Sequence, residues 1–421
     1  MNKFLLFNSP IFWNYTEENE EYLSPLGLGY IATYLELANI ETKLIDCVKL
    51  KLNSKQIIDL ISKESPDFIG INIFTQNYDI VKFIVESIKF KCVVFIGGAV
   101  VKFIYSDIIS WNVENKLNII IGDGELIIPA IVNNTCIDLP VIENKNISVY
   151  EVTRDSLYFP QDISKIELNR KFLKNEIIVN HYKQKEASIV TSRGCYYNCA
   201  FCGGARNLNI KIPIRIRSQD SICKELNDII HIYPQVSSIR ILDDLFLSDL
   251  HSIKKAIKVF SFFPHLKWRG MAHTIPLFKN KIEITNLKKH GCQELFLGIE
   301  SGSERIRQKI NKKGSLEQVY EVVSVLLKEG IDVKGYFIYG FPTETEKDFY
   351  DTFKMALSLS NISKFTKGNF RTSTFQFRPY HGTKLYNEIL SNGIEIKSCQ
   401  ENNYLHSSKN RNQFNFSSGN Y

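Results

Sequence analysis

The stretch Ala187-Ser-Ile-Val-Thr191-Ser-Arg-Gly-Cys195-Tyr-Tyr-Asn-Cys199-Ala-Phe-Cys202-Gly-Gly204 decides how this chain of 421 residues is organised. Its first five residues are small, apolar or β-branched, which is typical of a buried strand. Three cysteines follow within eight residues, and two glycines come directly after them. A strand that ends in such a loop begins a repeating pattern and also marks a place where chemistry is expected.

From this strand onward, short apolar segments alternate with segments of helical periodicity. Further strands are expected at Ser238–Leu242, Leu266–Met271, Glu294–Gly298, Val333–Tyr339 and Ser373–Phe377. Helices are expected between them at Ser221–Ile232, Leu247–Phe260, Pro276–His290, Leu316–Glu329 and Glu344–Leu359. Six strand–helix units are two fewer than a closed barrel contains, so the sequence predicts an open (β/α)6 partial TIM barrel of the α/β class. Ligands are expected at the carboxyl ends of its strands.

The N-terminal part of the chain shows the same alternation. Strands are expected near Phe4–Phe7, Lys43–Asp46, Phe68–Phe74, Val93–Ile96 and Ile119–Ile121. Helical periodicity lies between them at Leu26–Asn39, Ser54–Glu64, Asp79–Phe90 and about Phe103–Ser110. This pattern predicts a Rossmann-like, doubly wound parallel sheet. Gly97-Gly98 and Gly122-Asp123-Gly124 stand where strands end, so the backbone is expected to approach a ligand there.

We therefore divide the chain into four segments: a Rossmann-like domain (1–135), a connector (136–186), the partial barrel (187–392) and a C-terminal tail (393–421). The connector is rich in Asn, Lys and Glu and carries two prolines. The tail is rich in Ser, Asn and Lys from Asn402 onward, which indicates disorder or loose packing.

Bulk composition restricts the class of protein. A net charge of +7 is mild for this length, and no dense Lys/Arg stripe indicates nucleic acid. The apolar run near the N-terminus is too short for a secretory signal, and no stretch approaches the roughly 18 apolar residues of a membrane helix. The nine cysteines are odd in number and mostly scattered, which argues against a disulfide framework. These features predict a cytoplasmic protein that has no membrane and no nucleic-acid partner.

The three clustered cysteines, Cys195, Cys199 and Cys202, predict an iron–sulfur site. A [4Fe-4S] cluster takes four ligands, so three thiolates on one loop leave one iron open to a substrate. The amine and carboxylate of S-adenosylmethionine fit that position, and the reduced cluster can break the adjacent carbon–sulfur bond. Zinc is the alternative, but the candidate fourth ligands, His181 and Cys223, lack the spacing of a zinc motif.

Five motifs, each at an expected strand end, resemble the radical S-adenosylmethionine (radical SAM) superfamily over residues 187–390. They are the Cys-x3-Cys-x-Phe-Cys loop, Asp243-Asp244-Leu-Phe246, Leu297-Gly298-Ile-Glu300-Ser301-Gly302, Phe337-Ile-Tyr-Gly340-Phe-Pro342-Thr-Glu344-Thr345 and Arg378-Pro-Tyr-His-Gly382-Thr383. Their order along the chain is that of the superfamily. The resemblance implies reductive cleavage of S-adenosylmethionine to a 5′-deoxyadenosyl radical.

The resemblance also implies which residues bind. The metal ligands are Cys195, Cys199 and Cys202, and the candidate cosubstrate residues are Phe201, Gly203, Gly204, Asp243, Asp244, Glu300, Ser301, Gly340 and Pro342. Simpler roles remain open for several of them. The Asp243–Asp244 pair can cap a helix, Gly340 and Pro342 can form an ordinary turn, and the Phe201 ring can pack in the core.

The N-terminal segment resembles the cobalamin-binding-type domain that precedes many barrels of this superfamily. The similarity rests on Ser24-Pro25-Leu-Gly27-Leu-Gly29, on Gly97-Gly98-Ala99 and on Ile121-Gly122-Asp-Gly124-Glu125. It implies that Gly97, Gly98, Gly122, Gly124 and Glu125 lie against cobalamin. The Asp-x-His-x-x-Gly motif that supplies an axial histidine in other proteins is missing, since no histidine follows Asp46-Cys47-Val48.

A radical SAM barrel joined to a cobalamin domain predicts methylation of an unactivated carbon in a small molecule or peptide. An external electron donor such as flavodoxin or ferredoxin is implied. The alternative is non-methylating radical chemistry, such as epimerisation, desaturation, cyclisation or rearrangement, in which Cys223 or Cys399 returns a hydrogen atom. Sulfur insertion is disfavoured because the sequence shows no second cysteine cluster, and a non-catalytic carrier is disfavoured by the complete motif set.

Overall fold

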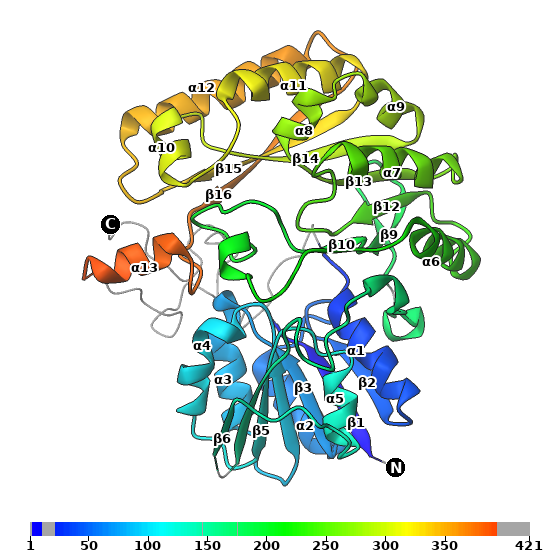
Figure 1. Ribbon diagram of the computed structural model, residues 1–421, viewed down its shortest axis with the longest axis vertical. Coiled ribbons are helices and arrows are strands. Elements are labelled where there is room, and N and C mark those ends of the chain that lie inside the picture. Colours follow the sequence, from blue (N-terminus) through cyan, green and yellow to red (C-terminus); the bar gives the residue numbers. More distant parts are fainter. Residues whose placement is uncertain (1, 11–21, 145, 175, 394–421) are drawn as a thin grey trace. The chain divides into compact units, whose positions relative to one another are not determined.

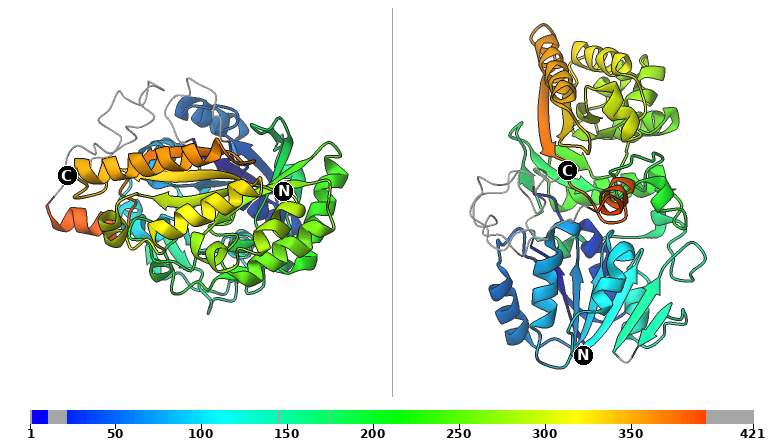
Figure 2. Two further views of the ribbon diagram at one scale, coloured as in Figure 1. Left: turned by 90° about the horizontal axis from the view of Figure 1, so that it is seen from above. Right: turned by 90° about the vertical axis from the view of Figure 1, so that its left-hand side faces the viewer.

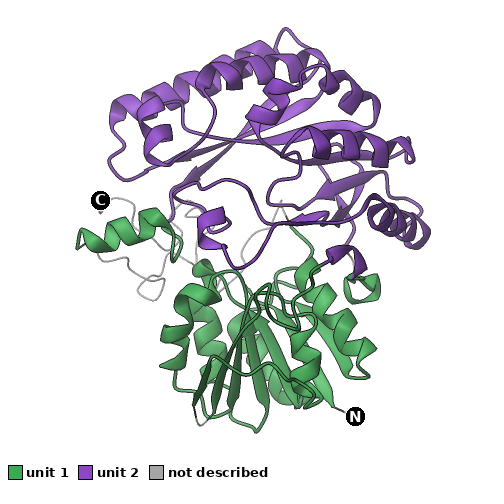
Figure 3. Cartoon of the chain, in the orientation of Figure 1, with its two compact units in different colours: residues 1–161, 166–174, 379–417 green, residues 162–165, 175–378, 418–421 purple. Residues whose placement is uncertain are grey.

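The computed structural model describes residues 2–10, 22–144, 146–174 and 176–393 (Figure 1). The chain forms two compact units. One contains residues 1–161, 166–174 and 379–417, and the other contains residues 162–165, 175–378 and 418–421 (Figure 3). Most of the predicted tail, 394–421, and with it Cys399, lies outside the described residues. Among the helices that the structure describes, none has the length and apolar character needed to span a membrane.

The first unit contains a seven-stranded sheet in the order β2-β1-β3-β4-β5-β7-β6. All neighbouring strands are parallel except β6 and β7, which are antiparallel. The strands are β1 (Lys3–Asn8), β2 (Glu41–Asp46), β3 (Phe68–Asn72), β4 (Val93–Gly97), β5 (Lys116–Ile121), β6 (Ile142–Asn144) and β7 (Ile147–Glu151). The first five match the predicted strands, so the parallel Rossmann-like sheet is confirmed.

The helices of the first unit are α1 (Leu26–Leu37), α2 (Ser54–Glu64), α3 (Tyr78–Glu86), α4 (Val101–Ile109), α5 (Ile127–Val132) and α13 (Lys384–Ser391), with the 3-10 turns η1 (Thr75–Asn77) and η3 (Arg170–Phe172). The apolar stripes of α2, α3 and α4 join one face of the sheet in a single buried core. Helix α2 begins where predicted because Asn53 and Gln56 form a reciprocal capping box.

The second unit contains a seven-stranded sheet in the order β16-β15-β14-β13-β12-β9-β8. Figure 2 shows the chain from two further sides, with this unit coloured from green to orange. Its strands are β8 (Ile178–Val179), β9 (Lys185–Ile189), β12 (Ser238–Ile241), β13 (Lys267–Ala272), β14 (Cys292–Glu300), β15 (Asp332–Tyr339) and β16 (Phe370–Gln376). The six strands from β9 to β16 are parallel and follow one another in chain order. The open partial barrel is therefore confirmed.

Helices cover the outer face of this barrel and share one buried core with it. They are α6 (Gln219–Ile232), α7 (Leu250–Ser261), α8 (Thr274–Lys279), α9 (Glu283–Lys289), α11 (Leu316–Lys328) and α12 (Glu346–Ser363). A further short helix, α10 (Glu304–Lys309), follows β14 and contributes no residue to this core. The short ribbon β10 (Ser192–Arg193) with β11 (Arg215–Ile216), and the turns η2 (Ile163–Lys165) and η4 (Arg206–Leu208), complete the unit. Each crossover returns the chain to the same edge, so the loops after β9, β12, β13, β14 and β15 gather at the carboxyl ends.

Candidate active site

The cysteine loop is held at its two ends. After β9 the chain pairs as the antiparallel ribbon β10–β11, which joins Ser192 to Ile216 and Arg193 to Arg215. Gly194 follows the ribbon with φ +101°, a conformation that side chains other than glycine rarely adopt. Farther along the loop, the amide of Ala200 donates to the carbonyl of Ile310 at 2.8 Å. These contacts fix the path of the loop without using a thiol.

The three thiols of the loop lie close enough to influence one another. Burial raises the pKa of all three, and that of Cys202 reaches about 12. A negative charge on Cys195 or Cys199 would raise the Cys202 pKa further. Three neighbouring thiolates therefore need a positive charge beside them to remain deprotonated, and bound iron supplies that charge.

The arrangement differs from a mononuclear metal site. Within the described ranges, no three His, Cys, Asp or Glu side chains converge to hold one ion. In a cubane cluster each thiolate binds a different iron, so the three sulfurs need not converge. Of the candidate zinc ligands, His181 lies in the turn before β9, at the opposite end of that strand from the cysteine loop, and Cys223 on α6 packs against the barrel core. Neither supports the zinc alternative.

Asp243 and Asp244 have different environments. Asp243 is buried and its carboxylate accepts the Thr191 amide at 2.6 Å and the Ser192 hydroxyl at 2.7 Å. Asp244 is exposed, accepts the Gly194 amide at 3.2 Å and raises the pKa of Cys195 and Cys202 by its charge, in addition to burial. The capping alternative for this pair is wrong, since the N-cap of α7 is Asp249. Asp243 thus anchors the start of the loop, while Asp244 faces the thiols.

Glu300, the last residue of β14, forms a buried ion pair with a residue that the sequence did not single out. The Lys312 ammonium lies 3.0 Å from Glu300 Oε1, and both side chains are about nine-tenths buried. Burial alone would lower the pKa of Lys312, but the charges of Glu300 and Cys199 outweigh it and raise that pKa. Glu300 has a φ of +67°, which costs about 1–3 kcal/mol in a non-glycine residue. Such strain at a charged strand end is typical of a functional position.

His273 follows β13 and carries a buried donor that has no partner among the described residues. Its ring stacks on Tyr197 of the cysteine loop at 4.0 Å between centroids. The Ile275 amide donates to Nδ1 at 3.2 Å, so the ring proton is on Nε2, and Nε2 is unpartnered. Burial, with the charges of Lys312 and Arg307, lowers the pKa of His273 to about 3, so the ring is neutral. A bound group with an acceptor atom would satisfy this N–H, which otherwise costs about 1–3 kcal/mol.

The remaining predicted residues of the barrel divide into open and packed positions. A Cβ at Gly203 would meet nothing within 4 Å, and one at Gly204 would lie 3.6 Å from Cys202 Sγ and 3.8 Å from Asp244. Phe201 packs its ring on Phe341 at 5.6 Å. The loop after the last cysteine therefore leaves room beside the thiols, which fits a bound cluster and cosubstrate.

Three further predicted residues are engaged within the protein. Ser301 is fully buried, and its hydroxyl bonds Thr352 at 3.0 Å and accepts the Ser303 amide at 3.1 Å. Gly340 has φ +80° and donates its amide to Glu344, and Pro342 follows it in the same turn. Binding through Ser301 would have to use its backbone carbonyl, because its amide also donates within the protein, to the Ile299 carbonyl at 2.9 Å.

The first unit carries a polar network at the carboxyl ends of β1, β2 and β3. The Asn8 amide donates to Asp46 at 2.8 Å, Asn72 donates to Asn8 at 3.0 Å, and Asn77 donates to Ser9 at 2.7 Å. Ligands of doubly wound sheets bind at this end of the strands. The sequence reasoning missed this network because isolated asparagines carry no motif.

The predicted glycines of the first unit also fall into two kinds. A Cβ at Gly98 would lie 2.4 Å from the Ile73 carbonyl oxygen, and one at Gly122 would lie 2.5 Å from that of Val152. The protein backbone itself requires these two glycines. By contrast, a Cβ at Gly97 would meet only the Ile120 carbonyl at 3.8 Å. A Cβ at Gly124 would meet only the ends of the Ile128 and Ile31 side chains. Glu125, beside Gly124, is buried.

Comparison with known proteins agrees with this geometry. The model of the radical SAM superfamily matches residues 189–356, and the model of the B12 binding domain matches residues 15–132. The chain is a radical SAM enzyme with a B12-binding domain. The radical SAM domain implies S-adenosylmethionine and a [4Fe-4S] cluster, and the B12-binding domain implies cobalamin.

Curated relatives of this radical SAM enzyme include named methyltransferases. An uncharacterized methyltransferase of Pyrococcus horikoshii is 27% identical over 387 residues, which cover 88% of this chain and 79% of the relative. Cytidylyl-2-hydroxyethylphosphonate methyltransferase of Streptomyces wedmorensis is 22% identical over 88% of this chain and 78% of its own length.

Solved structures share the fold. The cobalamin-dependent S-adenosylmethionine radical enzyme OxsB matches with a TM-score of 0.69 and 15% identity, covering 99% of this chain and 64% of OxsB. The radical S-adenosylmethionine methyltransferase TsrM from Kitasatospora setae matches with a TM-score of 0.67 and 16% identity, covering 93% of this chain and 76% of TsrM. The radical SAM enzyme thus spans less than two thirds of OxsB.

Proposed function

We propose that this enzyme cleaves S-adenosylmethionine reductively at a [4Fe-4S] cluster bound by Cys195, Cys199 and Cys202, and that it methylates an unactivated carbon with the help of cobalamin. The observation that carries the proposal is the gathering of the three thiols with Asp244, Lys312 and Glu300 at the carboxyl ends of the barrel strands. When bound, the cluster supplies the electron for cleavage, and cobalamin supplies the methyl group.

The charges around the thiols fit the methionyl end of the cosubstrate. Asp244 offers a carboxylate that accepts hydrogen bonds from the amine, and Lys312 offers an ammonium for the carboxylate. The Nε2–H of His273 is a further donor toward a bound acceptor, either an anionic oxygen or a sulfur of the cluster. Glu300 keeps Lys312 in place and cationic, because the pair is buried and 3.0 Å apart.

Cobalamin binding is supported by the carboxyl ends of the strands of the first unit. Gly97 leaves open space beside the end of β4, and the Asn8–Asp46 and Asn72–Asn8 bonds place side-chain amides at the ends of β1 and β3 and a carboxylate at the end of β2. Asp46 accepts the amides of Val48 and Lys49 at 3.1 Å, so the turn after β2 is closed by its own side chain. This closed turn contains no histidine, so the proposal includes no axial histidine from it.

Non-methylating radical chemistry is the second candidate. It needs a group that returns a hydrogen atom to the substrate radical, for which Cys223 and Cys399 were the candidates, and Cys399 lies outside the described residues. The structure places Cys223 on the outer helix α6, packed against the barrel core, which gives this candidate no support. The named methyltransferases among the relatives favour methyl transfer.

The test uses the reconstituted enzyme in the absence of oxygen. Iron content and the visible spectrum report the cluster, and cobalamin is seen separately by its corrin absorption. Cys195→Ala, Cys199→Ala and Cys202→Ala should each lose most of the iron and all 5′-deoxyadenosine formation with dithionite as reductant. Cys136→Ser is the control, because Cys136 lies on the other unit and is partly exposed. Full cleavage in any one of the three alanine variants rejects the assignment.

The methyl-transfer step needs its own readout. S-adenosylmethionine with a deuterated methyl group should label the product and give equal amounts of 5′-deoxyadenosine and S-adenosylhomocysteine. Product formation without S-adenosylhomocysteine, and without any need for cobalamin, would support the non-methylating alternative instead.

A further inference from the structure

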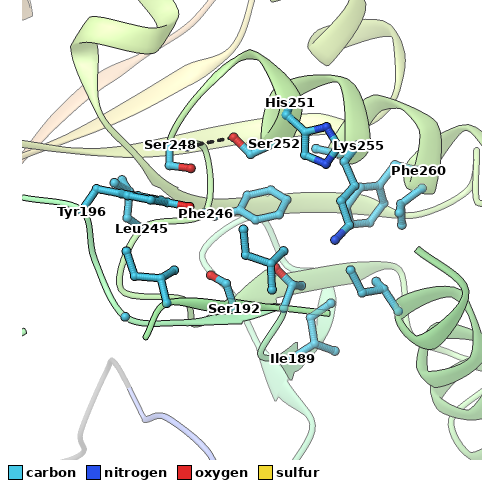
Figure 4. Close-up of a pocket in the computed structure, with 17 residues that line it drawn as sticks. Ile189, Ser192, Tyr196, Leu245, Phe246, Ser248, His251, Ser252, Lys255 and Phe260 are labelled. Atoms are coloured by element: carbon cyan, nitrogen blue, oxygen red, sulfur yellow. Dashed lines mark hydrogen bonds between the residues drawn. The ribbon is translucent and has the colours of Figure 1, made fainter. Parts of the chain in front are cut away.

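A pocket lies on the outer side of the barrel, directly behind the cysteine loop. Its walls come from the cysteine loop, the β10–β11 ribbon, the segment after β12, and α7 (Figure 4). Gly194 and Tyr196, the two neighbours of Cys195, both line it. The two chain neighbours of a proposed cluster ligand are therefore part of the pocket wall.

The wall of the pocket is apolar, and some of its apolar side chains reach solvent. Phe246 projects into the middle of the pocket with Phe260 beyond it (Figure 4). At the surface, Tyr196 and Ile216 of this wall are 48% and 42% exposed, and Leu250, which starts α7 outside the pocket wall, is 39% exposed. Exposed apolar groups gathered at one place mark an interaction site more often than they mark an ordinary surface.

The charged side chains that helix α7 itself carries have one sign. Helix α7 carries His251, Lys254, Lys255 and Lys258 and contains no Asp or Glu. These four positions are three and four residues apart, so they form one stripe along the helix. His251 and Lys255 line the pocket, and His251, Lys254 and Lys258 are exposed. Asp249, the nearest acidic residue in sequence, is held as the N-cap by Ser252.

This surface resembles those that electron carriers use. An apolar centre gives contact area, and a rim of a single charge steers a partner of the opposite charge and sets the association rate. A short path matters too, since an electron entering at Tyr196 or Gly194 arrives next to Cys195. The three features occur together on one face of the barrel unit.

We infer that this face, defined by Tyr196, Ile216, Leu250, His251, Lys254 and Lys258, is the docking site for a small acidic protein that carries one electron at a time. The inference rests on the proposed cluster function. In the step, the carrier loses one electron and the cluster gains it, and no bond or proton is exchanged. The carrier's flavin or iron–sulfur group is the reductant.

The experiment measures the rate of cluster reduction by reduced flavodoxin in stopped flow. The variant Lys254→Glu with Lys258→Glu should lower the second-order rate constant about tenfold or more at low ionic strength, and salt should no longer slow the reaction. Reduction by dithionite, a small reductant that needs no docking, should be unchanged. The matched control is Lys347→Glu with Lys354→Glu on α12, which changes the charge equally on another exposed helix face.

The outcomes separate the two proposals. If native enzyme fails to cleave S-adenosylmethionine even with dithionite, the proposed function falls, and the docking site falls with it. If native enzyme works with both reductants but the α7 variant matches the α12 control, only the docking site is wrong. If the α7 variant keeps its full iron content but its cluster is reduced more slowly, and by the same factor, with flavodoxin and with dithionite, the docking site is also rejected. The substitutions have then changed the cluster itself. A small apolar molecule retained in the pocket, seen by native mass spectrometry, would give the pocket another occupant and overturn the inference.

Discussion

Arg269 on β13 donates two hydrogen bonds to Glu186 on β9, at 2.7 and 2.6 Å, although β12 separates the two strands in the sheet. Both side chains are buried inside the barrel. Arg269 also reaches Glu294 on β14 at 3.3 Å, and Arg371 on β16 donates to Glu294 at 2.9 Å. A row of side chains with alternating charge thus connects β9, near one edge of the sheet, through β13 and β14 to β16 at the other edge. It lies on the concave face, whereas the apolar core lies under the helices.

Removing one partner of this pair should destabilise the barrel. Burial raises the pKa of Glu186, but the bonds from Arg269 outweigh it and leave that pKa below its usual value. Glu186→Leu leaves a buried guanidinium short of its main partner and should cost about 3 kcal/mol in the free energy of unfolding. The double variant Glu186→Leu with Arg269→Met should recover most of that loss. Urea unfolding of both variants checks this; a double variant as unstable as the single one would contradict it.

Glu300→Gln should weaken cosubstrate binding while leaving the cluster spectrum intact. The change removes the charge that holds Lys312 in place, and one charge-assisted hydrogen bond is worth about 1.5–3 kcal/mol, or roughly a ten- to hundredfold change in affinity. Calorimetry with S-adenosylmethionine measures it. Ser301→Ala is a useful comparison, because its hydroxyl is bonded within the protein and should affect stability rather than affinity. An unchanged affinity in Glu300→Gln removes the ion pair from the site.

Gly97→Val should lose cobalamin in a folded protein. Its side chain would enter space that the protein leaves open, with only the Ile120 carbonyl nearby at 3.8 Å. Gly98→Val is not a clean test, because a Cβ there lies 2.4 Å from the Ile73 oxygen and the variant should destabilise the sheet. Circular dichroism reports folding, and corrin absorbance after gel filtration reports binding. Full retention of cobalamin by folded Gly97→Val would show that β4 does not contact it.

The ion pair of Arg305 with Asp348 predicts a pH dependence of stability. Hydrogen bonds from Arg305, followed by those from Ser303 and Thr345, hold the pKa of Asp348 below its usual value. An unfolded Asp titrates at about 3.9. The pair therefore contributes its full stability above that pH, and the contribution is lost as pH falls toward the lower folded pKa. Because Arg305 is half exposed and water screens the pair, we expect this contribution to stability to be small.

Asp348→Asn is the matching variant. Its unfolding free energy should be lower than that of the native chain at neutral pH, and the two should converge as the solution is acidified. Chemical unfolding at a series of pH values measures the difference. A constant difference over the acid range would mean that the loss comes from the capping box of α12 and not from the charge of Asp348.

The alternation of apolar strands with helical segments made the fold predictable from the sequence. Details of the fold that depend on single polar side chains could not be predicted. The predicted helix Pro276–His290 is two helices, α8 and α9, because Asn280 closes the first by bonding the Pro276 carbonyl at 2.8 Å. Strands β6 and β7 lie among the Asn, Lys and Glu residues that predicted a connector, since a short strand of mixed character gives little periodic signal.

From the sequence, only those residues of the candidate site that stand in recognisable motifs could be predicted. The cysteines and Asp244 stand in motif positions, and the structure brings them together. Lys312 and His273 have no motif spacing, and they enter the site because the chain after α10 and the end of β13 fold toward the loop. One signal was available for His273: it follows a predicted barrel strand, where ligand sites gather.

The β10–β11 ribbon and the Asp243 bonds to Thr191 and Ser192 also predict an order for folding and metal binding. These contacts close the segment 194–214 at both ends with amides, hydroxyls and a carboxylate, and none of them involves a thiol. In a zinc finger, by contrast, the metal supplies most of the folding free energy and the apo chain is unfolded. We therefore expect the polypeptide to hold this loop in place before a cluster binds. An intact cluster handed over by a carrier protein should then be able to bind the folded chain.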